Sequence, residues 1–396
     1  MDPHYTEWLN LLVRWVHMIV GIAWIGASFY FVWLENNLNR KDPKEGLSGD
    51  LWAIHGGGIY HLQKYKLAPE KMPDHLHWFK WEAYTTWLTG VLLLGVVYYL
   101  NAQLYLLAPG SELTPLQGIG ISIASLVAGW FIYDFLCDSA LGKRPALLGV
   151  VLLVLLVAAA WALSQVFSGR AAYIHIGAIT GTMMVGNVFR VIMPGQRKLV
   201  AAITEGREPD PEAPAKALLR SRHNNYLTLP VLFIMISNHF PSTYGSEWNW
   251  AILFAIAMLS VLVRHYFNTR HHSQNWAWTL PAAALGMFAL AYVTKPAPIV
   301  PAANSAAVEE VTLEQVTSIV VERCASCHAA NPTSDMFSTA PAGVILESSE
   351  DVILNAAQIH AQSVATQAMP LGNITGMLPE ERAKIGTWFD LYATSK

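Results

Sequence analysis

Residues 146–167 read ALLGVVLLVLLVAAAWALSQVF, an apolar run without a charged side chain. A helix needs about 20 such residues to cross the hydrocarbon core of a bilayer. Seven other stretches have a similar character, although the sixth of the whole set is short and the seventh ends with Arg264 and His265. The sequence therefore predicts a bundle of eight membrane-spanning helices over residues 8–34, 83–101, 116–136, 146–167, 171–193, 225–240, 248–267 and 276–293.

The basic residues of the predicted loops alternate along the chain. Loop 35–82 carries seven Lys or Arg residues and loop 194–224 carries six, whereas loops 102–115 and 241–247 carry none. Loops on the cytoplasmic side of a membrane concentrate Lys and Arg. We therefore predict a multi-pass protein of the bacterial inner membrane, with the two large loops in the cytoplasm and both termini in the periplasm.

The composition changes after residue 294. Residues 295–308 are rich in Pro and Ala, which is typical of a semi-rigid, extended linker, and residues 309–396 have the mixed composition of a soluble domain. We predict a membrane domain over 1–294, a linker over 295–308 and a small periplasmic domain over 309–396. The net charge of −3 argues against a nucleic-acid partner.

The C-terminal segment contains Cys324-Ala325-Ser326-Cys327-His328, the C-x-x-C-H signature of a covalently attached c-type haem. The thiols of Cys324 and Cys327 would bind the porphyrin, and His328 would be an axial ligand of the iron. The predicted fold is thus all-α, an eight-span bundle followed by a small class I-like cytochrome c domain. The remaining cysteine, Cys137, is isolated and receives no role.

The iron of such a haem needs a ligand on its other face. Met369 precedes a proline in a loop well separated from His328, and we predict it as the second axial ligand, with Met377 as the alternative. Helices that pack around the haem are expected at about 312–323, 351–365 and 379–392.

Ionisable residues inside membrane spans are costly and usually functional. The outer layer contains four candidates for substrate handling, of which His17 lies deepest in apolar surroundings: Arg14, His17, His175 and His239. The inner layer contains a second set, Arg190, Arg264, His265 and the glycine-rich segment 55–64.

Several longer motifs run through the membrane domain. They are RWVH at 14–17, GIAWIGASFY at 21–30, HGGGIYH at 55–61, HWFKWE at 77–82, MPGQ at 193–196 and SNHFP at 237–241. Taken together, they resemble the bacterial membrane-bound urate hydroxylase family, whose members carry a C-terminal cytochrome c.

The resemblance implies oxidation of urate to 5-hydroxyisourate in purine catabolism. Electrons would leave through the haem c to the respiratory chain, by way of a soluble cytochrome c or a terminal oxidase. Proximity to the haem favours the layer of His17 as the substrate site, whereas a supply of urate from the cytosol favours the inner layer. If the inner layer binds urate, His17 with His175 or His239 would instead ligate a b-type haem.

Two other functions fit parts of the sequence. A membrane-anchored cytochrome c could carry electrons without a substrate of its own, but one span would suffice as its anchor. A redox-linked transporter would use the buried polar residues, yet such proteins are commonly built from internal repeats, and this chain shows none.

Overall fold

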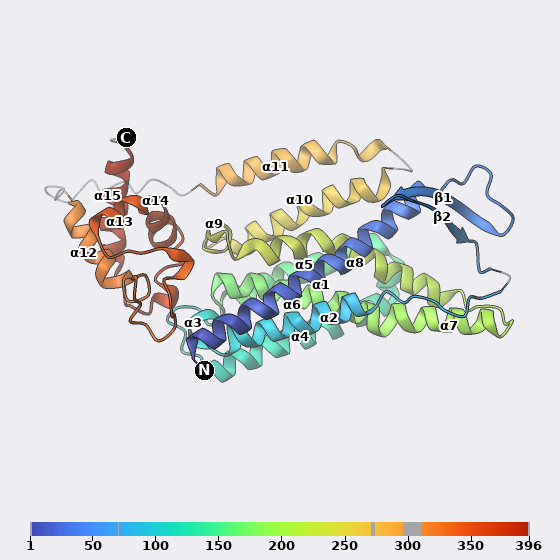
Figure 1. Ribbon diagram of the computed structural model, residues 1–396, viewed down its shortest axis with the longest axis horizontal. Coiled ribbons are helices and arrows are strands. Elements are labelled where there is room, and N and C mark those ends of the chain that lie inside the picture. The colour runs from blue at the N-terminus through green and yellow to red at the C-terminus, as the bar shows by residue number, and fades with distance from the viewer. Residues whose placement is uncertain (1, 70, 271–273, 296–310, 395–396) are drawn as a thin grey trace.

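A computed structural model of the protein describes residues 2–69, 71–270, 274–295 and 311–394. Within them, a long helical bundle carries a small helical domain at one end (Figure 1). The bundle contains α1 (Pro3–Asn37), α2 (Trp81–Leu93), α3 (Ala102–Tyr105), α4 (Pro115–Asp138), α5 (Pro145–Ser164), α6 (Gly169–Gly186), α7 (Met193–Thr204), α8 (Glu212–Ser237), α9 (Pro241–Tyr244), α10 (Asn249–Thr269) and α11 (Thr279–Val293). The small domain contains α12 (Leu313–Cys324), α13 (Ser349–Leu354), α14 (Ala356–Ile359) and α15 (Pro379–Thr394).

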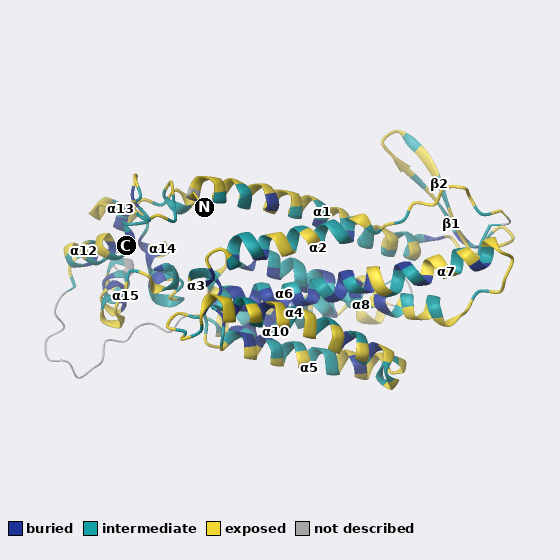
Figure 2. Ribbon diagram, turned by 90° about the horizontal axis from the view of Figure 1, so that it is seen from below, coloured by how far each residue is buried: buried dark blue, intermediate teal, exposed yellow. Residues whose placement is uncertain are grey.

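Helix α6 forms the centre of the bundle. It packs against α2, α4, α5, α8 and α10, and it is among the most buried segments in Figure 2. Small residues allow this close approach, as is usual between membrane helices. Gly177 of α6, for example, faces Ile234 of α8 so closely that a Cβ at position 177 would lie 2.6 Å from the Ile234 side chain.

The outside of the bundle is apolar. Large hydrophobic side chains are exposed along α1, α4, α5 and α11, which a soluble protein would not tolerate over so wide an area. Among the residues that the structure describes, six helices could cross a membrane by length and composition: His4–Asn37, Pro115–Asp138, Pro145–Ser164, Gly169–Thr204, Asn249–Thr269 and Gln274–Val293. These features are those of a membrane protein.

Two of the eight predicted spans are not in this set, although both lie on helices of the bundle. The span predicted at 83–101 is divided, because α2 changes at Leu94 into the π-helix η1 (Leu94–Tyr99). The span predicted at 225–240 belongs to α8, which begins at Glu212 and includes charged residues such as Arg220. The predicted loop 194–224 is also largely helical, since α7 and the start of α8 occupy it.

The prediction of an all-α fold is wrong for loop 35–82. This loop contains an antiparallel hairpin of β1 (Leu47–His55) and β2 (Gly58–Tyr65), in which His55 pairs with Gly58. The two residues between the strands, Gly56 and Gly57, have φ values of 57° and 79°. A two-residue type I′ turn requires positive φ at both positions, and glycine adopts it without strain. The glycine run therefore makes a hairpin turn.

The two ends of the bundle differ. The N-terminus of α1 lies at the end that carries the small domain, and the hairpin and α7 lie at the opposite end (Figure 1). Glu35, near the end of α1, anchors the hairpin through ion pairs with Lys64 at 2.6 Å and Arg40 at 2.7 Å. Ser338 of the small domain donates a hydrogen bond to Glu7 of α1 at 3.4 Å.

The small domain is built on its first and last helices, as predicted. Helices α12 and α15 pack together over a core that includes Val316, Val320 and Ile385. The helix predicted at 351–365 is divided into α13, α14 and the π-helix η6 (His360–Ala365). The predicted linker, apart from residue 295, lies outside the described residues.

Candidate functional site

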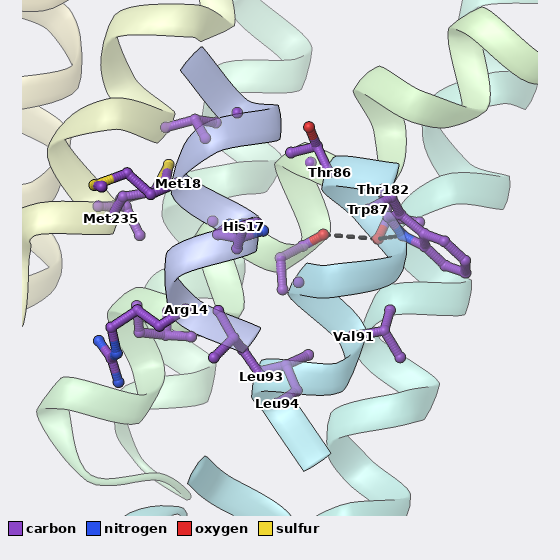
Figure 3. A pocket seen from close by; sticks show the side chains of 18 of the residues that line it. Arg14, His17, Met18, Thr86, Trp87, Val91, Leu93, Leu94, Thr182 and Met235 are labelled. Atoms are coloured by element: carbon purple, nitrogen blue, oxygen red, sulfur yellow. Dashed lines mark hydrogen bonds between the residues drawn. The ribbon is translucent and has the colours of Figure 1, made fainter. Parts of the chain in front are cut away.

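A cavity of about 340 Å³ lies between α1, α2, α6 and α8. It brings together three of the four predicted outer residues, Arg14, His17 and His239, and its wall also includes Asn238. Figure 3 shows His17 on α1 beside the helix that carries Thr86 and Trp87. The cavity therefore collects a cation, two imidazoles and an amide in an apolar bundle.

The hydrogen bonds around His17 indicate which of its two ring nitrogens carries the proton and which one can act as a base. Its Nδ1 lies 2.9 Å from Oγ1 of Thr89. The Thr89 hydroxyl lies 2.7 Å from the carbonyl oxygen of Thr85 and 3.0 Å from that of Thr86. When the hydroxyl donates to either carbonyl, it accepts a hydrogen bond from Nδ1–H of His17. A neutral imidazole with a proton on Nδ1 has an unprotonated Nε2. His17 can thus take a proton from a ligand at Nε2.

Helix α2 has a glycine at the position that faces this imidazole. A Cβ at Gly90 would lie 3.3 Å from Cε1 of His17, so a larger side chain would push the ring from its place. Because Gly90 has no side chain, the imidazole of His17 fits between α1 and α2.

The remaining wall of the cavity is aromatic and apolar. The indoles of Trp24 and Trp87 line it, and the Trp87 indole nitrogen is already used by Thr182, to which it donates at 3.1 Å (Figure 3). The Tyr98 hydroxyl is buried beside the side chains of Asn238 and Arg170. Flat apolar walls with a few polar groups suit a planar, hydrogen-bonding ligand.

His175, the fourth predicted residue, does not line this cavity. Its Nδ1 donates to the carbonyl of Ala171 at 2.7 Å, and its Nε2 lies 2.6 Å from the hydroxyl of Ser122. Both nitrogens are therefore satisfied within the protein. Its ring packs edge-on against Tyr98, which does line the cavity, so His175 supports the wall from behind.

The inner layer contains a buried arginine that the sequence reading counted as a loop charge. Arg220 of α8 is 1% exposed and pairs with Asp134 at 2.7 Å and with Asp138 at 3.3 Å. It also donates to Asn187 at 3.3 Å. The spacing of the two aspartates, one helical turn apart on α4, was the signal that could have revealed it.

The predicted inner candidates are divided among three places. Arg264 donates from Nε to Asn225 at 2.8 Å, and His265 lies 2.8 Å from the Tyr226 hydroxyl. Arg190 is exposed. In segment 55–64, His61 pairs with Asp50 at 2.7 Å inside the hairpin. None of these inner-layer residues lines the cavity of His17.

The small domain presents the residues of the haem signature in a suitable form. Cys324 and Cys327 are free thiols, and burial raises the pKa of the Cys324 thiol to about 12, which keeps it protonated. His328 donates from Nδ1 to the carbonyl of Val344 at 3.0 Å. Such a bond orients a histidine so that Nε2 can bind a metal. Both candidate methionines, Met369 and Met377, line a cavity of about 720 Å³. These residues fit a c-type haem.

An apolar helical bundle with a largely apolar cavity that holds a few polar side chains defines a membrane protein with a candidate site for a small ligand. The chain belongs to the urate oxidase N-terminal family, whose sequence profile matches residues 3–295. Membership indicates an oxidoreductase whose function concerns urate, with a purine as its substrate. The apolar helices indicate a lipid bilayer as its surroundings. The match ends before α12, so it does not include the haem signature. No curated protein and no solved structure matches the chain.

Proposed function

We propose that this protein is a membrane-bound enzyme that oxidises urate to 5-hydroxyisourate and passes the electrons to a haem c on its own C-terminal domain. The cavity that joins Arg14, His17 and His239 carries the proposal. It supplies the chemistry that urate oxidation needs, in the part of the chain that defines the family.

Urate is a planar anion with several carbonyl oxygens. The guanidinium of Arg14 offers a positive charge and paired N–H donors for such an edge, and the indoles of Trp24 and Trp87 offer flat faces for stacking. The volume of about 340 Å³ lies within the usual range for small-molecule sites.

Oxidation of urate to 5-hydroxyisourate removes two electrons and two protons and adds the oxygen of one water molecule at C5. His17 accepts a proton at Nε2, because Thr89 keeps the other ring nitrogen protonated. The apolar wall of the cavity limits the access of water to the ring. We therefore expect water to add at C5 alone, after the ring has lost its electrons.

The haem would be held by Cys324 and Cys327, with His328 and Met369 as axial ligands. It supplies one-electron transfer, so each urate requires two successive transfers. Electrons then pass to a soluble cytochrome c or a terminal oxidase. We place the bundle in the bacterial inner membrane with both termini in the periplasm. Two observations support this orientation. Loop 35–82 is rich in basic residues, and the start of α1 and the small domain lie at the end of the bundle opposite to this loop (Figure 1).

The same histidine layer could serve a b-type haem instead of a substrate. That use requires two imidazoles with free nitrogens, and both nitrogens of His175 are bonded within the protein. The pair would have to be His17 and His239. A pyridine haemochrome assay on the purified protein should detect haem c alone, and haem b at equal amount would contradict the substrate site proposed here.

The decisive experiment is anaerobic addition of urate to the purified, oxidised protein. Urate should reduce the haem, seen as the appearance of the ferrous absorption band, and His17→Ala should abolish this reduction while leaving the covalent haem and its reduction by dithionite intact. Unchanged urate-driven reduction in His17→Ala would remove His17 from the mechanism. A wild-type haem that urate does not reduce would overturn the proposed function.

A further inference from the structure

The cavity of about 720 Å³ lies between the bundle and the small domain. The bundle lines it with α3, the start of α6 and α9, through residues that include Tyr105, Arg170 and Tyr244. The small domain lines it with the loop that contains Met369 and with the start of α15, where Arg382 lies. Two parts of the chain that are far apart in sequence thus enclose one space.

The contact between the two parts is close around this space. Helix α3 packs on the short helix η7 (Leu371–Asn373), and α9 packs on η6. Gly245, which follows α9, is so near the small domain that a Cβ there would lie 2.7 Å from Cβ of Thr366. The cavity is therefore a defined volume inside an interface of packed elements.

Neither attachment cysteine lines this cavity. Cys324 belongs to the core cluster of the small domain that also contains Met377, and Met377 lines the cavity. Tyr105 and Arg382 both line the cavity, as does Met369. A porphyrin bound to these thiols and ligated by Met369 would therefore have an edge turned towards the bundle.

The wall of the cavity includes two arginines, the positive charges expected for a carboxylate-bearing group. Arg382 is committed to its own domain, since it donates to the carbonyls of Ser363 and Met369. Arg170 comes from the bundle and lies over the ring of Tyr105 at 5.7 Å. Glu247, which is exposed, is the acidic residue on this wall.

Arg170 also joins this cavity to the first one. Its Nε donates to Oδ1 of Asn238 at 3.1 Å, and Asn238 lines the cavity of His17. The ring of Tyr98 lines that same cavity, and its hydroxyl interacts electrostatically with Arg170. The two cavities therefore share one wall, of which Arg170 is the charged member.

We propose that the interdomain cavity binds the propionate-bearing edge of the haem c, and that Arg170 is the positioning residue that pairs with a propionate from the side of the membrane domain. This inference rests on the proposed attachment of haem at Cys324 and Cys327. Arg170 would hold the haem edge against the wall of the substrate cavity, which keeps the path for electrons short and fixed.

The first test measures the midpoint potential of the haem in Arg170→Gln. A positive charge beside a propionate stabilises the reduced haem, so its loss should lower the ratio of reduced to oxidised haem about tenfold at a fixed potential, which corresponds to about 59 mV for one electron. Arg170→Lys keeps the charge and should restore most of the potential. Arg144→Gln, a change at the first turn of α5 remote from the small domain, serves as the control.

The second test leaves residue 170 unsubstituted, so it does not depend on the folding of an Arg170 variant. An arginine-selective dicarbonyl reagent, followed by peptide mass spectrometry, should modify Arg170 less in the haem-loaded protein than in a Cys324→Ala, Cys327→Ala protein without haem. Arg144 should react equally in both.

The outcomes separate this inference from the proposed function. If urate reduces a covalent haem whose potential is unchanged in Arg170→Gln, or if Arg170 reacts equally with and without haem, the role of Arg170 is wrong and the enzyme assignment stands. If the chain carries no covalent haem when produced with a haem-attachment system, both fall.

Discussion

At the scale of single residues, the role proposed for His17 depends on Thr89, a threonine that does not line the cavity. Thr89 accepts the Nδ1–H bond of His17 and donates to a backbone carbonyl of its own helix. Replacing its hydroxyl by a methyl group, as in Thr89→Val, removes the partner that fixes the protonated nitrogen. A neutral hydrogen bond contributes about 1 kcal/mol, so kcat for urate oxidation should fall about fivefold to tenfold.

Thr85→Val is the matched control for this prediction. Thr85 lies one turn earlier on α2, and its hydroxyl also donates to a carbonyl of the same helix, that of Trp81 at 2.6 Å. It does not line the cavity of His17. Steady-state urate oxidation with equal haem content should distinguish the two variants, and equal losses of kcat in both would show that helix stability, not the imidazole, is affected.

A second prediction at this scale concerns the acid stability of the small domain. Arg323 donates to Glu381 with N–O distances of 2.8–3.2 Å, and these hydrogen bonds hold the pKa of Glu381 below its ordinary value. A lowered native pKa stabilises the folded state fully above the ordinary pKa of about 4.3. The contribution is lost as the pH falls through the lowered native value.

Glu381→Gln should therefore lower the hydrogen-exchange protection of α12 and α15 at pH 7 in the full chain. The difference from the wild type should shrink towards pH 3, because protonation removes the same ion pair from the wild type. Glu322→Gln is the control, since Glu322 also pairs with Arg323, at 3.2 Å, but its side chain is 62% exposed. A difference that stays constant with pH would contradict the assigned ion pair.

The sequence could identify some of these residues because of their spacing on one helix. Arg14 and His17 are three positions apart on α1, which places them on the same face. His175 had the same appearance, a histidine among apolar residues, yet the structure gives it Ser122 and Ala171 as partners. A single sequence does not show which groups lie opposite a side chain, and so it cannot separate a satisfied histidine from a free one.

At the scale of elements, glycines determine how closely the central helices pack. A Cβ at Gly129 of α4 would lie 2.6 Å from the side chain of Ile179 on α6, whereas a Cβ at Gly120 of the same helix would meet nothing within 4 Å. Gly129→Ala should destabilise the protein by about 1–3 kcal/mol through overpacking. Gly120→Ala should be neutral or stabilising, because alanine favours helix by about 1 kcal/mol.

Thermal unfolding in one detergent measures both alanine variants. The midpoint should fall for Gly129→Ala and stay or rise for Gly120→Ala. Because the two substitutions are identical and lie on one helix, their difference reports only the packing of α4 on α6. A Gly129→Ala protein as stable as the wild type would mean that the two helices can separate at no cost.

Local chemistry explains which elements the sequence predicted. Apolar runs such as residues 146–167 identified α5, and Pro379 with the acidic residues after it marked the start of α15. The hairpin was missed because Gly56-Gly57 was taken as part of a flexible, ligand-binding loop, although two glycines between β-prone segments indicate a type I′ turn. The π-helix that interrupts the span at 83–101 has no comparable signature, because it depends on the packing around Leu94 and Tyr98.

At the scale of the whole molecule, the charges in the sequence and the arrangement of the helices indicate the same sidedness. Helix α1 has 35 residues, so it is about 50 Å long, which exceeds the hydrocarbon core of about 30 Å. We expect α1 to cross the bilayer, and its two ends would then lie in opposite aqueous compartments. The small domain adjoins the first end and the hairpin adjoins the second (Figure 1), which separates the haem signature from the basic loop 35–82 by the membrane.

Reporter fusions at these two places give the last prediction. Alkaline phosphatase joined after Lys396 should be active and green fluorescent protein should be dark there, because the small domain is expected in the periplasm. A reporter inserted between Gly56 and Gly57, where an exposed turn tolerates insertion, should behave in the opposite way. We expect the seven basic residues of loop 35–82 to hold this side in the cytoplasm. An active phosphatase at the hairpin would reverse the topology, and it would also deny the haem signature the compartment in which haem is attached.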